Sequence, residues 1–244
     1  MRSERVVLAM WLVAGVASAA SAQTPATQEK TVPVFEEPRH HLIVDTPSLR
    51  ILDIQIPPGD TTLFHAHSSP LLYVPIASSR MRSQNLGDGW SGGGAAPAAA
   101  TAAPEAAPRP GSVFAPANYV DKGQTHRVNN VGTSLFRLIG IGNMTPGEAA
   151  EPGASTSKPE LENRWYRAER LVIAPGASAP LPPASGTVVV VMQTTGSAAL
   201  DGRDWFPLNG PGDLARIDGT TPYVVRNRGT SEIEVVAVAV KGAK

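Results

Sequence analysis

The most informative stretch of this sequence is PPGDTTLFHAH, residues 57–67. Its first four residues, Pro57 to Asp60, are typical of a turn. The residues that follow, Thr62 to His67, predict a β-strand. Side chains two positions apart in a strand point to the same face, so the rings of His65 and His67 can approach one ion.

A second stretch, DKGQTHRVNN at residues 121–130, brings a third histidine, His126, shortly after the turn-forming Gly123. Three imidazoles on neighbouring strands can bind one face of a metal ion and leave other positions open for water or substrate. The alternative is that the three rings are hydrogen-bonded residues of a barrel without metal. The other two histidines, His40 and His41, are adjacent, so at most one faces the interior. We expect a surface or strand-pairing role for them.

Short strands joined by turns are predicted along the rest of the chain, which has 23 Gly, 23 Pro and only 5% aromatic residues. Leu49 to Ile56 nearly alternates apolar and polar residues, as expected of a half-buried strand. Leu71 to Ala77 is a further strand candidate. Val188 to Met192 and Val235 to Val240 are continuous apolar runs typical of core strands. Residues 128–141 predict a hairpin that turns between Asn130 and Thr133.

Two parts of the chain resemble one another. Ile56 to Gly59 matches Ile173 to Gly176 at an offset of 117 residues, and Gly123 to Thr125 matches Gly219 to Thr221 at an offset of 96. The offsets differ by 21 residues, close to the length of the Gly-, Ala- and Pro-rich segment 91–110. A duplicated barrel with that loop inserted in the first copy explains both offsets. Chance similarity between two β-rich segments is the alternative.

The histidine stretches resemble the two motifs of the cupin superfamily. Gly59, five residues and then His65-Ala66-His67 resembles the first motif. Residues 121–130 resemble the second, with Asp121 in place of the usual proline. The resemblance covers about residues 38–244 and implies an all-β fold of two cupin-like β-barrels, of jelly-roll type, in tandem.

One departure from the family pattern concerns the metal ligands. The first cupin motif usually places a glutamate four or five residues beyond its second histidine, where this chain has Leu71 and Leu72. The resemblance therefore implies the three-histidine variant found in some thiol, diketone and aromatic-ring dioxygenases. One divalent ion is expected, with Fe(II) favoured and Zn, Mn, Ni or Cu open. Three neutral ligands leave the ion its full charge, which favours an anionic or chelating partner.

The second barrel is expected to be a degenerate copy without metal, because Pro182, Ala184 and Pro222 align with the three histidines. The expected domains are a signal peptide (1–22), a flexible N-terminal arm (23–37), a metal-binding barrel (38–145) with a low-complexity loop (91–110), a linker (146–163) and the degenerate barrel (164–244).

The first 22 residues predict export. Arg2 and Arg5 precede the apolar run Val6 to Val16, and Ala20-Ser21-Ala22 offers a cleavage site before Gln23. The run is too short for a spanning helix. We therefore expect a periplasmic or secreted protein that leaves the membrane after cleavage, and the absence of cysteine suits that compartment.

Four further residues are candidates near the site. Asn130 is expected to order its turn through its side chain. Tyr73, Arg137 and Gln84 are candidates for contacts with a substrate or with the ligands, although a structural role is the more common one for each. No catalytic residue beyond the metal ligands is evident.

These features are compatible with three hypotheses about function. The first is a mononuclear, iron-type oxidoreductase or dioxygenase that acts on a small chelating or anionic substrate. The second is a periplasmic module that binds a metal or small ligand without catalysis, or a zinc-type hydrolase or isomerase. The third is an interaction protein whose site has decayed. With 21 basic and 21 acidic residues and no basic stripe, nucleic acid is not expected as a partner. Homo-oligomer formation stays open.

Overall fold

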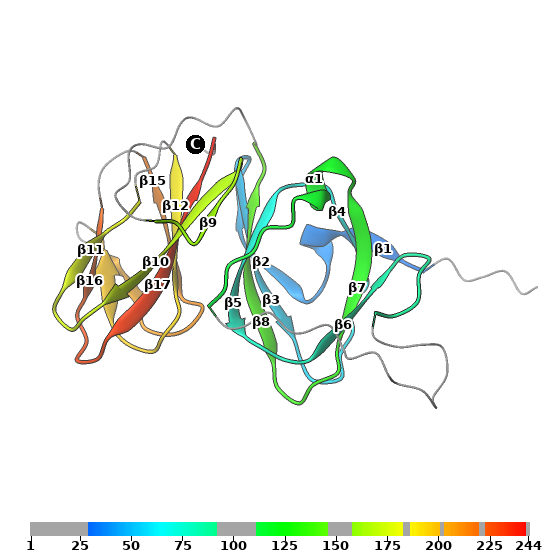
Figure 1. Cartoon of the computed structure of the whole chain (residues 1–244), viewed down its shortest axis with the longest axis horizontal. Coiled ribbons are helices and arrows are strands. Elements are labelled where there is room, and N and C mark those ends of the chain that lie inside the picture. Colours follow the sequence, from blue (N-terminus) through cyan, green and yellow to red (C-terminus); the bar gives the residue numbers. More distant parts are fainter. Residues whose placement is uncertain are drawn as a thin grey trace, which may run out of the picture.

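A computed structural model describes residues 29–91, 111–145, 158–182, 186–200, 203–219 and 223–242 of this chain. It consists of two β-rich units, the first in the blue-to-green half of the chain and the second in the yellow-to-red half (Figure 1). The predicted signal peptide and nearly all of the predicted loop 91–110 lie outside the described residues, as do Ala184 and Pro222. In the described part of the chain, no helix is long and apolar enough to cross a membrane.

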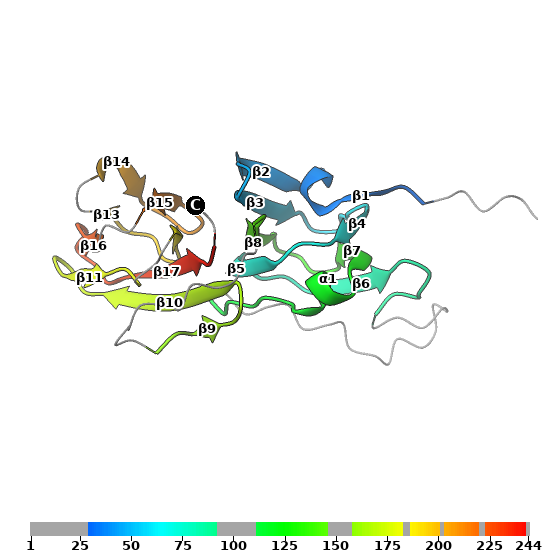
Figure 2. The same cartoon turned by 90° about the horizontal axis from the view of Figure 1, so that it is seen from above.

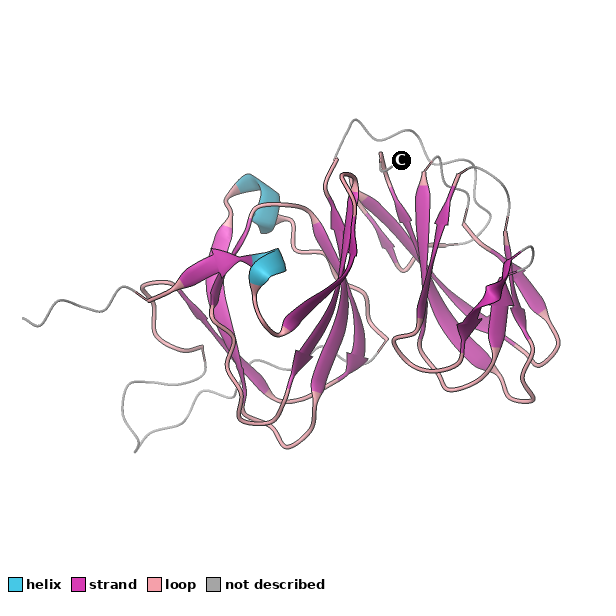
Figure 3. Cartoon of the chain, turned by 180° about the vertical axis from the view of Figure 1, so that it is seen from behind, coloured by secondary structure: helices cyan, strands magenta, loops and turns pink. Residues whose placement is uncertain are grey.

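The first unit is formed by two four-stranded sheets, in the orders β1-β4-β7-β6 and β2-β3-β8-β5. Its strands are β1 (Thr31–Pro33), β2 (His40–Asp45), β3 (Leu49–Ile56), β4 (Phe64–His67), β5 (Leu71–Ala77), β6 (Met81–Asn85), β7 (Gln124–Asn130) and β8 (Phe136–Asn143). Two short helical turns accompany them, η1 (Val34–Glu36) and α1 (Asn118–Asp121), shown in cyan in Figure 3.

The second unit has a five-stranded sheet, β15-β12-β17-β10-β9, and a four-stranded sheet, β11-β16-β13-β14. Its strands are β9 (Leu161–Glu162), β10 (Tyr166–Ile173), β11 (Ser178–Pro180), β12 (Thr187–Met192), β13 (Ala198–Leu200), β14 (Arg203–Leu208), β15 (Leu214–Asp218), β16 (Val224–Asn227) and β17 (Ile233–Val240). The fold of two tandem β-barrels predicted from the sequence is thus confirmed in its sheet groupings.

Strand β3 is buried on both faces, one inside the first unit and the other against the second. Its bounds are those predicted, but both of its faces contact apolar side chains. Leu52, Ile54 and Ile56 point into the core of the first unit. Leu49 and Ile51 point the other way, into an apolar cluster that also contains residues of the second unit. Alternation along one strand therefore supplies both the inner core and the contact between the units.

The units pack together through the outer face of sheet β2-β3-β8-β5 and strands β10, β12 and β17 (Figure 2). Tyr166 of β10 is fully buried at this contact. Its hydroxyl lies 2.7 Å from the carbonyl oxygen of Pro70 and 2.9 Å from that of Ile141, and it accepts a hydrogen bond from the Asn143 amide at 2.9 Å. One phenol of the second unit thus accepts from one backbone amide of the first and shares its single proton between two carbonyls.

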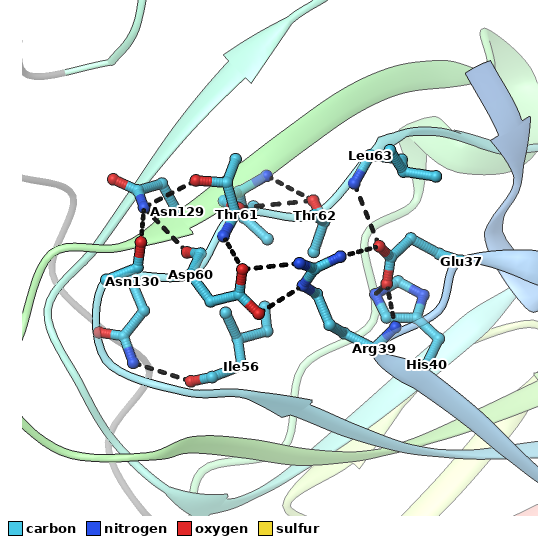
Figure 4. Close-up of polar contacts among 12 residues, drawn as sticks. Glu37, Arg39, His40, Ile56, Asp60, Thr61, Thr62, Leu63, Asn129 and Asn130 are labelled. Atoms are coloured by element: carbon cyan, nitrogen blue, oxygen red, sulfur yellow. Dashed lines mark hydrogen bonds and ion pairs between the residues drawn. The ribbon is translucent and has the colours of Figure 1, made fainter. Parts of the chain in front are cut away.

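The turn after β7 is built around a fully buried asparagine. The Nδ2 atom of Asn130 donates to the Ile56 carbonyl at 2.8 Å (Figure 4). It also donates to the Ser134 carbonyl at 2.8 Å, and Oδ1 accepts the Gly132 amide at 3.0 Å. The side chain also accepts the Ser79 hydroxyl at 2.7 Å. Asn130 therefore orders its turn as the sequence predicted.

The second unit repeats this turn at Asn227. Its Nδ2 donates to the carbonyls of Ile173 and Ser231, both at 2.8 Å, and its Oδ1 accepts the Gly229 amide at 2.9 Å. The repeat corrects the predicted alignment by one residue. Counting back four residues from each asparagine, the equivalent of His126 is Tyr223 rather than Pro222.

Two local predictions are wrong. Residues 128–141 do not form a hairpin, because β7 and β8 belong to different sheets and their connection crosses between them. The end of the expected flexible arm is ordered instead. Strand β1 pairs in parallel with β4, with Val32 opposite His65, and the neighbouring Val34 is buried. A three-residue pairing with a distant strand leaves no periodic signal in the sequence.

Candidate metal centre

A cavity of about 370 Å³ lies inside the first unit. Most of its lining is apolar, and the described residues that line it include no Asp, Glu, Lys or Arg. The apolar lining consists of Ile54, Ile56, Met81, Phe114, Pro116, Val128, Phe136 and Leu138, and the polar lining of four histidines, Tyr73, Ser83, Tyr119 and Gln124. The polar part is therefore concentrated in imidazole rings.

Strands β4 and β7 bring the three predicted ligands together. His65 lies directly opposite His126 in the register of the two strands, and His67 is two residues further along β4. One nitrogen from each of the three rings lies within 4.8 Å of the other two. Of the described residues, these form the one group of histidine or carboxylate side chains that could hold a metal ion.

The hydrogen bonds of the rings fit a metal site. The Nδ1 atom of His65 lies 3.0 Å from the Leu63 carbonyl. Because a carbonyl can only accept, Nδ1 carries the proton and the lone pair of Nε2 is available to a metal ion. The Nε2 atoms of His67 and His126 face each other at 3.0 Å. Two nitrogens bonded to one ion at about 2.1 Å and about 90° lie at this separation. The buried Nδ1 of His67 has no hydrogen-bond partner among the described groups.

Burial keeps these rings neutral. Desolvation is the largest cause for each, followed by the neighbouring imidazoles, and it lowers the pKa of His65 to about 3 and that of His126 to about 3. The pKa of His67 is lowered further still, for the same reasons. A histidine must be unprotonated to bind a metal, so all three are in the binding form at neutral pH.

His40 and His41 both pair with β3, one of the two roles expected for them, but His40 also faces the interior. It is 6% exposed, lines the cavity, and has its ring centroid 4.7 Å from that of His65, whereas His41 is exposed. Its Nδ1 donates to the Val34 carbonyl at 2.8 Å, and burial lowers its pKa to about 4. The buried carboxylate of Glu37 lies 3.9 Å from its Nε2. The sequence places the adjacent His40 and His41 on opposite faces of a strand, but it does not show which face is the inner one.

The environment of Glu37 explains how that carboxylate is stabilised. It accepts the backbone amides of Arg39 at 2.6 Å and Leu63 at 3.1 Å, and the Arg39 guanidinium bridges it to Asp60 (Figure 4). The network joins η1, β2 and the turn before β4. It therefore fixes the start of the strand that carries His65.

Two tyrosines lie beside the histidines. The ring of Tyr119, from α1, stacks on His67 with a centroid separation of 4.0 Å and an interplanar angle of 20°. Tyr73, a predicted site residue, lines the cavity and stacks on Phe114 at 5.0 Å. Burial first, and then the Tyr119 hydroxyl with which it shares a hydrogen bond, raises the pKa of Tyr73 well above its ordinary value. The phenol of Tyr73 therefore stays protonated.

The other two predicted contacts lie outside the cavity. Arg137 is on the outer face of β8, where it pairs with Asp53 at 2.9 Å and donates to the Pro211 carbonyl of the second unit. Gln84 accepts a hydrogen bond from Arg127 at 2.7 Å, whereas Met81 and Ser83 of the same strand line the cavity. Alternation along each strand puts both side chains on the face away from the histidines.

No carboxylate stands where the cupin motif would place one. Leu71 belongs to the core of the first unit, and Leu72 to the cluster shared with the second. Both side chains are buried, at 1% and 0% exposure. The donor set around the cavity is therefore one of imidazoles, which suits a divalent transition-metal ion.

Known structures share this architecture. AerE from Microcystis aeruginosa superposes with a TM-score of 0.52 at 9% identity, over 84% of this chain and 98% of that chain. A salicylate 1,2-dioxygenase from Pseudaminobacter salicylatoxidans gives a TM-score of 0.53 at 10% identity, over 80% and 71%. A cupin 2 conserved barrel domain protein from Leptotrichia buccalis gives 0.49 at 15%, over 82% and 87%. The chain shares its fold of two cupin-like β-barrels with AerE and the salicylate dioxygenase, whose TM-scores exceed 0.5.

This likeness concerns the fold alone, since the identities are 9–15%. A scan of protein-family models gives no match to this sequence, and a search of curated proteins gives none either. The function of the barrel in this chain therefore depends on the residues of its own site.

Proposed function

We propose that this protein is a mononuclear metal-dependent cupin oxidoreductase, of the iron-type dioxygenase class, that acts on a small chelating or anionic substrate. The observation that carries the proposal is the meeting of three neutral imidazoles from β4 and β7 in a largely apolar cavity without a carboxylate ligand. Iron(II) is the favoured ion, because histidine ligation with open positions suits non-haem iron that binds substrate and oxygen together. Export through residues 1–22 is part of the proposal.

The cavity supports a particular kind of substrate. The lining described above offers no fixed cation, so only a bound metal ion can balance the charge of an anionic ligand. The apolar side chains suit an aromatic or alkyl body and exclude water from it. Tyr73 and Tyr119 share a hydrogen bond, so the hydroxyl that accepts in this pair can donate its own proton to a polar group of the substrate. The ion supplies redox chemistry when bound, and these residues orient the substrate.

We also propose that the protein is a bicupin whose second barrel has lost its ligands. The asparagine-centred turn that occurs at both Asn130 and Asn227 supports a duplication. Gly59 and Gly176, which the sequence aligned, each donate their amide to the carbonyl of that asparagine, at 2.8 and 3.1 Å. All five histidines precede residue 127 and the chain has no cysteine, so the second barrel has neither of these ligand types.

Metal analysis tests the proposal. The mature protein is purified without a histidine tag and its metal content is compared with that of a His65→Ala/His67→Ala variant. We expect about one iron per chain in the wild type and none in the variant. The exposed His41→Ala is the matched control and should keep the metal.

Oxygen uptake then decides the reaction class. Iron-loaded protein is supplied with diketones, thiols and catechols in air. Uptake that depends on both substrate and His65 supports the oxidoreductase. Stoichiometric zinc without oxygen uptake would move the function to metal binding or to hydrolysis, and absence of metal even after reconstitution would make the histidines structural.

A further inference from the structure

The segment from Gly111 to α1 is attached to both units. The Val113 amide donates to Oε1 of Glu160 in the second unit at 3.0 Å. Arg170 of β10 holds that carboxylate by two hydrogen bonds, Nε to Oε2 at 2.8 Å and Nη2 to Oε1 at 3.1 Å. The backbone of Gly111 lies against the same guanidinium, since a Cβ atom there would meet Arg170 Nη1 at 3.2 Å.

Side chains of this segment alternate between two environments. Val113 and Ala115 pack against the apolar cluster shared by the units, whereas Phe114 and Pro116 line the metal cavity. Phe114 is fixed to Tyr73 by two backbone hydrogen bonds, of 2.8 and 3.2 Å. An extended segment turns successive side chains to opposite faces, so one short stretch contacts the second unit and encloses the cavity of the first.

The same segment ends at the metal ligands. It leads into α1, where Tyr119 stacks on His67, and in Figure 1 this green stretch begins beside the second unit and reaches α1 over the first. The connection therefore runs from Glu160 to Val113, along the chain to Phe114, and from Phe114 to Tyr73 through backbone hydrogen bonds and ring stacking. The hydrogen bond between Tyr73 and Tyr119 completes it.

We propose that Glu160 is a positioning residue through which the second barrel holds one wall of the metal cavity and thereby selects ligands with an apolar body. This inference rests on the proposed function for the identity of the cavity as the ligand site. It gives the barrel without ligands a role in the chemistry of the first. Small ligands that touch only the metal do not depend on that wall.

Three variants separate the effects. Glu160→Ala removes both the Val113 contact and a carboxylate partner of Arg170. Glu160→Gln keeps an oxygen that accepts from Val113 but loses the charge. Glu234→Ala is the matched control, because Glu234 is the other carboxylate paired with Arg170 and has no hydrogen bond to the segment among those found.

Hydrogen exchange of residues 111–121 tests the positioning without any ligand. We expect exchange about tenfold faster in Glu160→Ala, near the wild-type rate in Glu234→Ala, and intermediate in Glu160→Gln. Unchanged exchange in Glu160→Ala overturns the inference, whatever the metal site does. Absence of metal in the wild type would sink the proposed function instead, while exchange would still decide the positioning.

Two probes test ligand selection in cobalt(II)-reconstituted protein, followed by its visible absorption. Azide contacts the ion alone, and nitrocatechol is a two-oxygen chelator with an aromatic body. In Glu160→Ala we expect nitrocatechol affinity to fall about fivefold or more with azide affinity and cobalt content unchanged, and Glu160→Gln to restore part of the loss. Equal changes for both probes, or none, overturn the inference.

Discussion

Four histidine rings meet inside the first unit, and three of them come from strands β4 and β7. The fourth, His40, comes from β2 and has its proton fixed on Nδ1 by the Val34 carbonyl. Its other nitrogen is therefore an acceptor beside the ligand His65. The Glu37 network holds both strands in place, so the site depends on buried polar groups as well as on the ligands.

Acid sensitivity of the metal-free protein follows from these rings. Burial lowers the pKa of His40 to about 4 and that of His65 and His126 to about 3, so below about pH 6.5 the unfolded chain takes up protons before the folded one does. Stability should be complete above that pH and be lost as the pH falls towards about 3. Each ring can contribute up to about 3 kcal/mol.

Urea unfolding of metal-free protein at several pH values measures this. The free energy of unfolding should fall steadily between about pH 7 and pH 4.5, and His40→Gln should reduce the slope. The exposed His41→Ala serves as control and should leave the slope as it is. A free energy that stays constant over this range would contradict the assignment of buried neutral rings.

Removal of metal should destabilise the protein. An ion that binds only the folded state raises stability by about 2.7 kcal/mol at a free concentration a hundred times its dissociation constant. We expect a chelator to lower the melting temperature of the wild type and to leave that of His126→Ala unchanged. A chelator effect of equal size in both proteins would show that the stabilising ion binds elsewhere.

At the scale of elements, the repeated asparagine turn is the clearest structural device. In both units it closes the same connection by satisfying two carbonyls and one amide with a single side chain. One of those carbonyls belongs to the end of an early strand, at Ile56 or Ile173. The turn thus ties together strands far apart in the sequence.

Asn130→Ala and Asn227→Ala should therefore cost similar amounts of stability. Each leaves buried carbonyls unpaired, and we expect a loss of about 2–4 kcal/mol. Chemical denaturation measures both, and substitution by Asp, which keeps the acceptor but not the donor, should recover only part of it. If Asn227→Ala were neutral while Asn130→Ala was not, the two turns would not be equivalent.

Sequence patterns predicted the bounds of some strands correctly and one connection between strands wrongly. The bounds of β3 and β5 were predicted because alternation and apolar runs survive in any context. The 128–141 hairpin failed because the turn residues that join strands of one sheet also join strands of two. Of the candidate site, the meeting of His65, His67 and His126 followed from their spacing in the sequence. His40 and Tyr119 did not, because only tertiary packing decides which way a ring from another element points.

On the scale of the whole molecule, the units share an apolar cluster. Leu72 and Ile139 of the first lie in the same cluster as Tyr166 and Val238 of the second. Unfolding of either unit would expose the other unit's part of this cluster to water, which costs free energy. Unfolding is therefore expected to be cooperative across the whole chain.

Tyr166→Phe tests this coupling. Loss of the hydroxyl removes its hydrogen bonds with the Asn143 amide and the Pro70 carbonyl, which keep their 3.1 Å hydrogen bond to each other, and we expect a cost of about 0.5–1.5 kcal/mol. Calorimetry should show one transition in both proteins, shifted to lower temperature in the variant. Two separate transitions in the wild type would mean that the units unfold independently.

Strand β1 has a consequence for how the chain is processed. It covers one edge of β4, whose other edge is paired with β7, so the strand that bears two of the histidines has no free edge. An uncovered edge strand invites pairing with another molecule. Proteolytic trimming past Thr31 would uncover that edge and should make the protein prone to aggregation or strand exchange. An affinity tag that is cleaved from the N-terminus should therefore be placed well ahead of this residue.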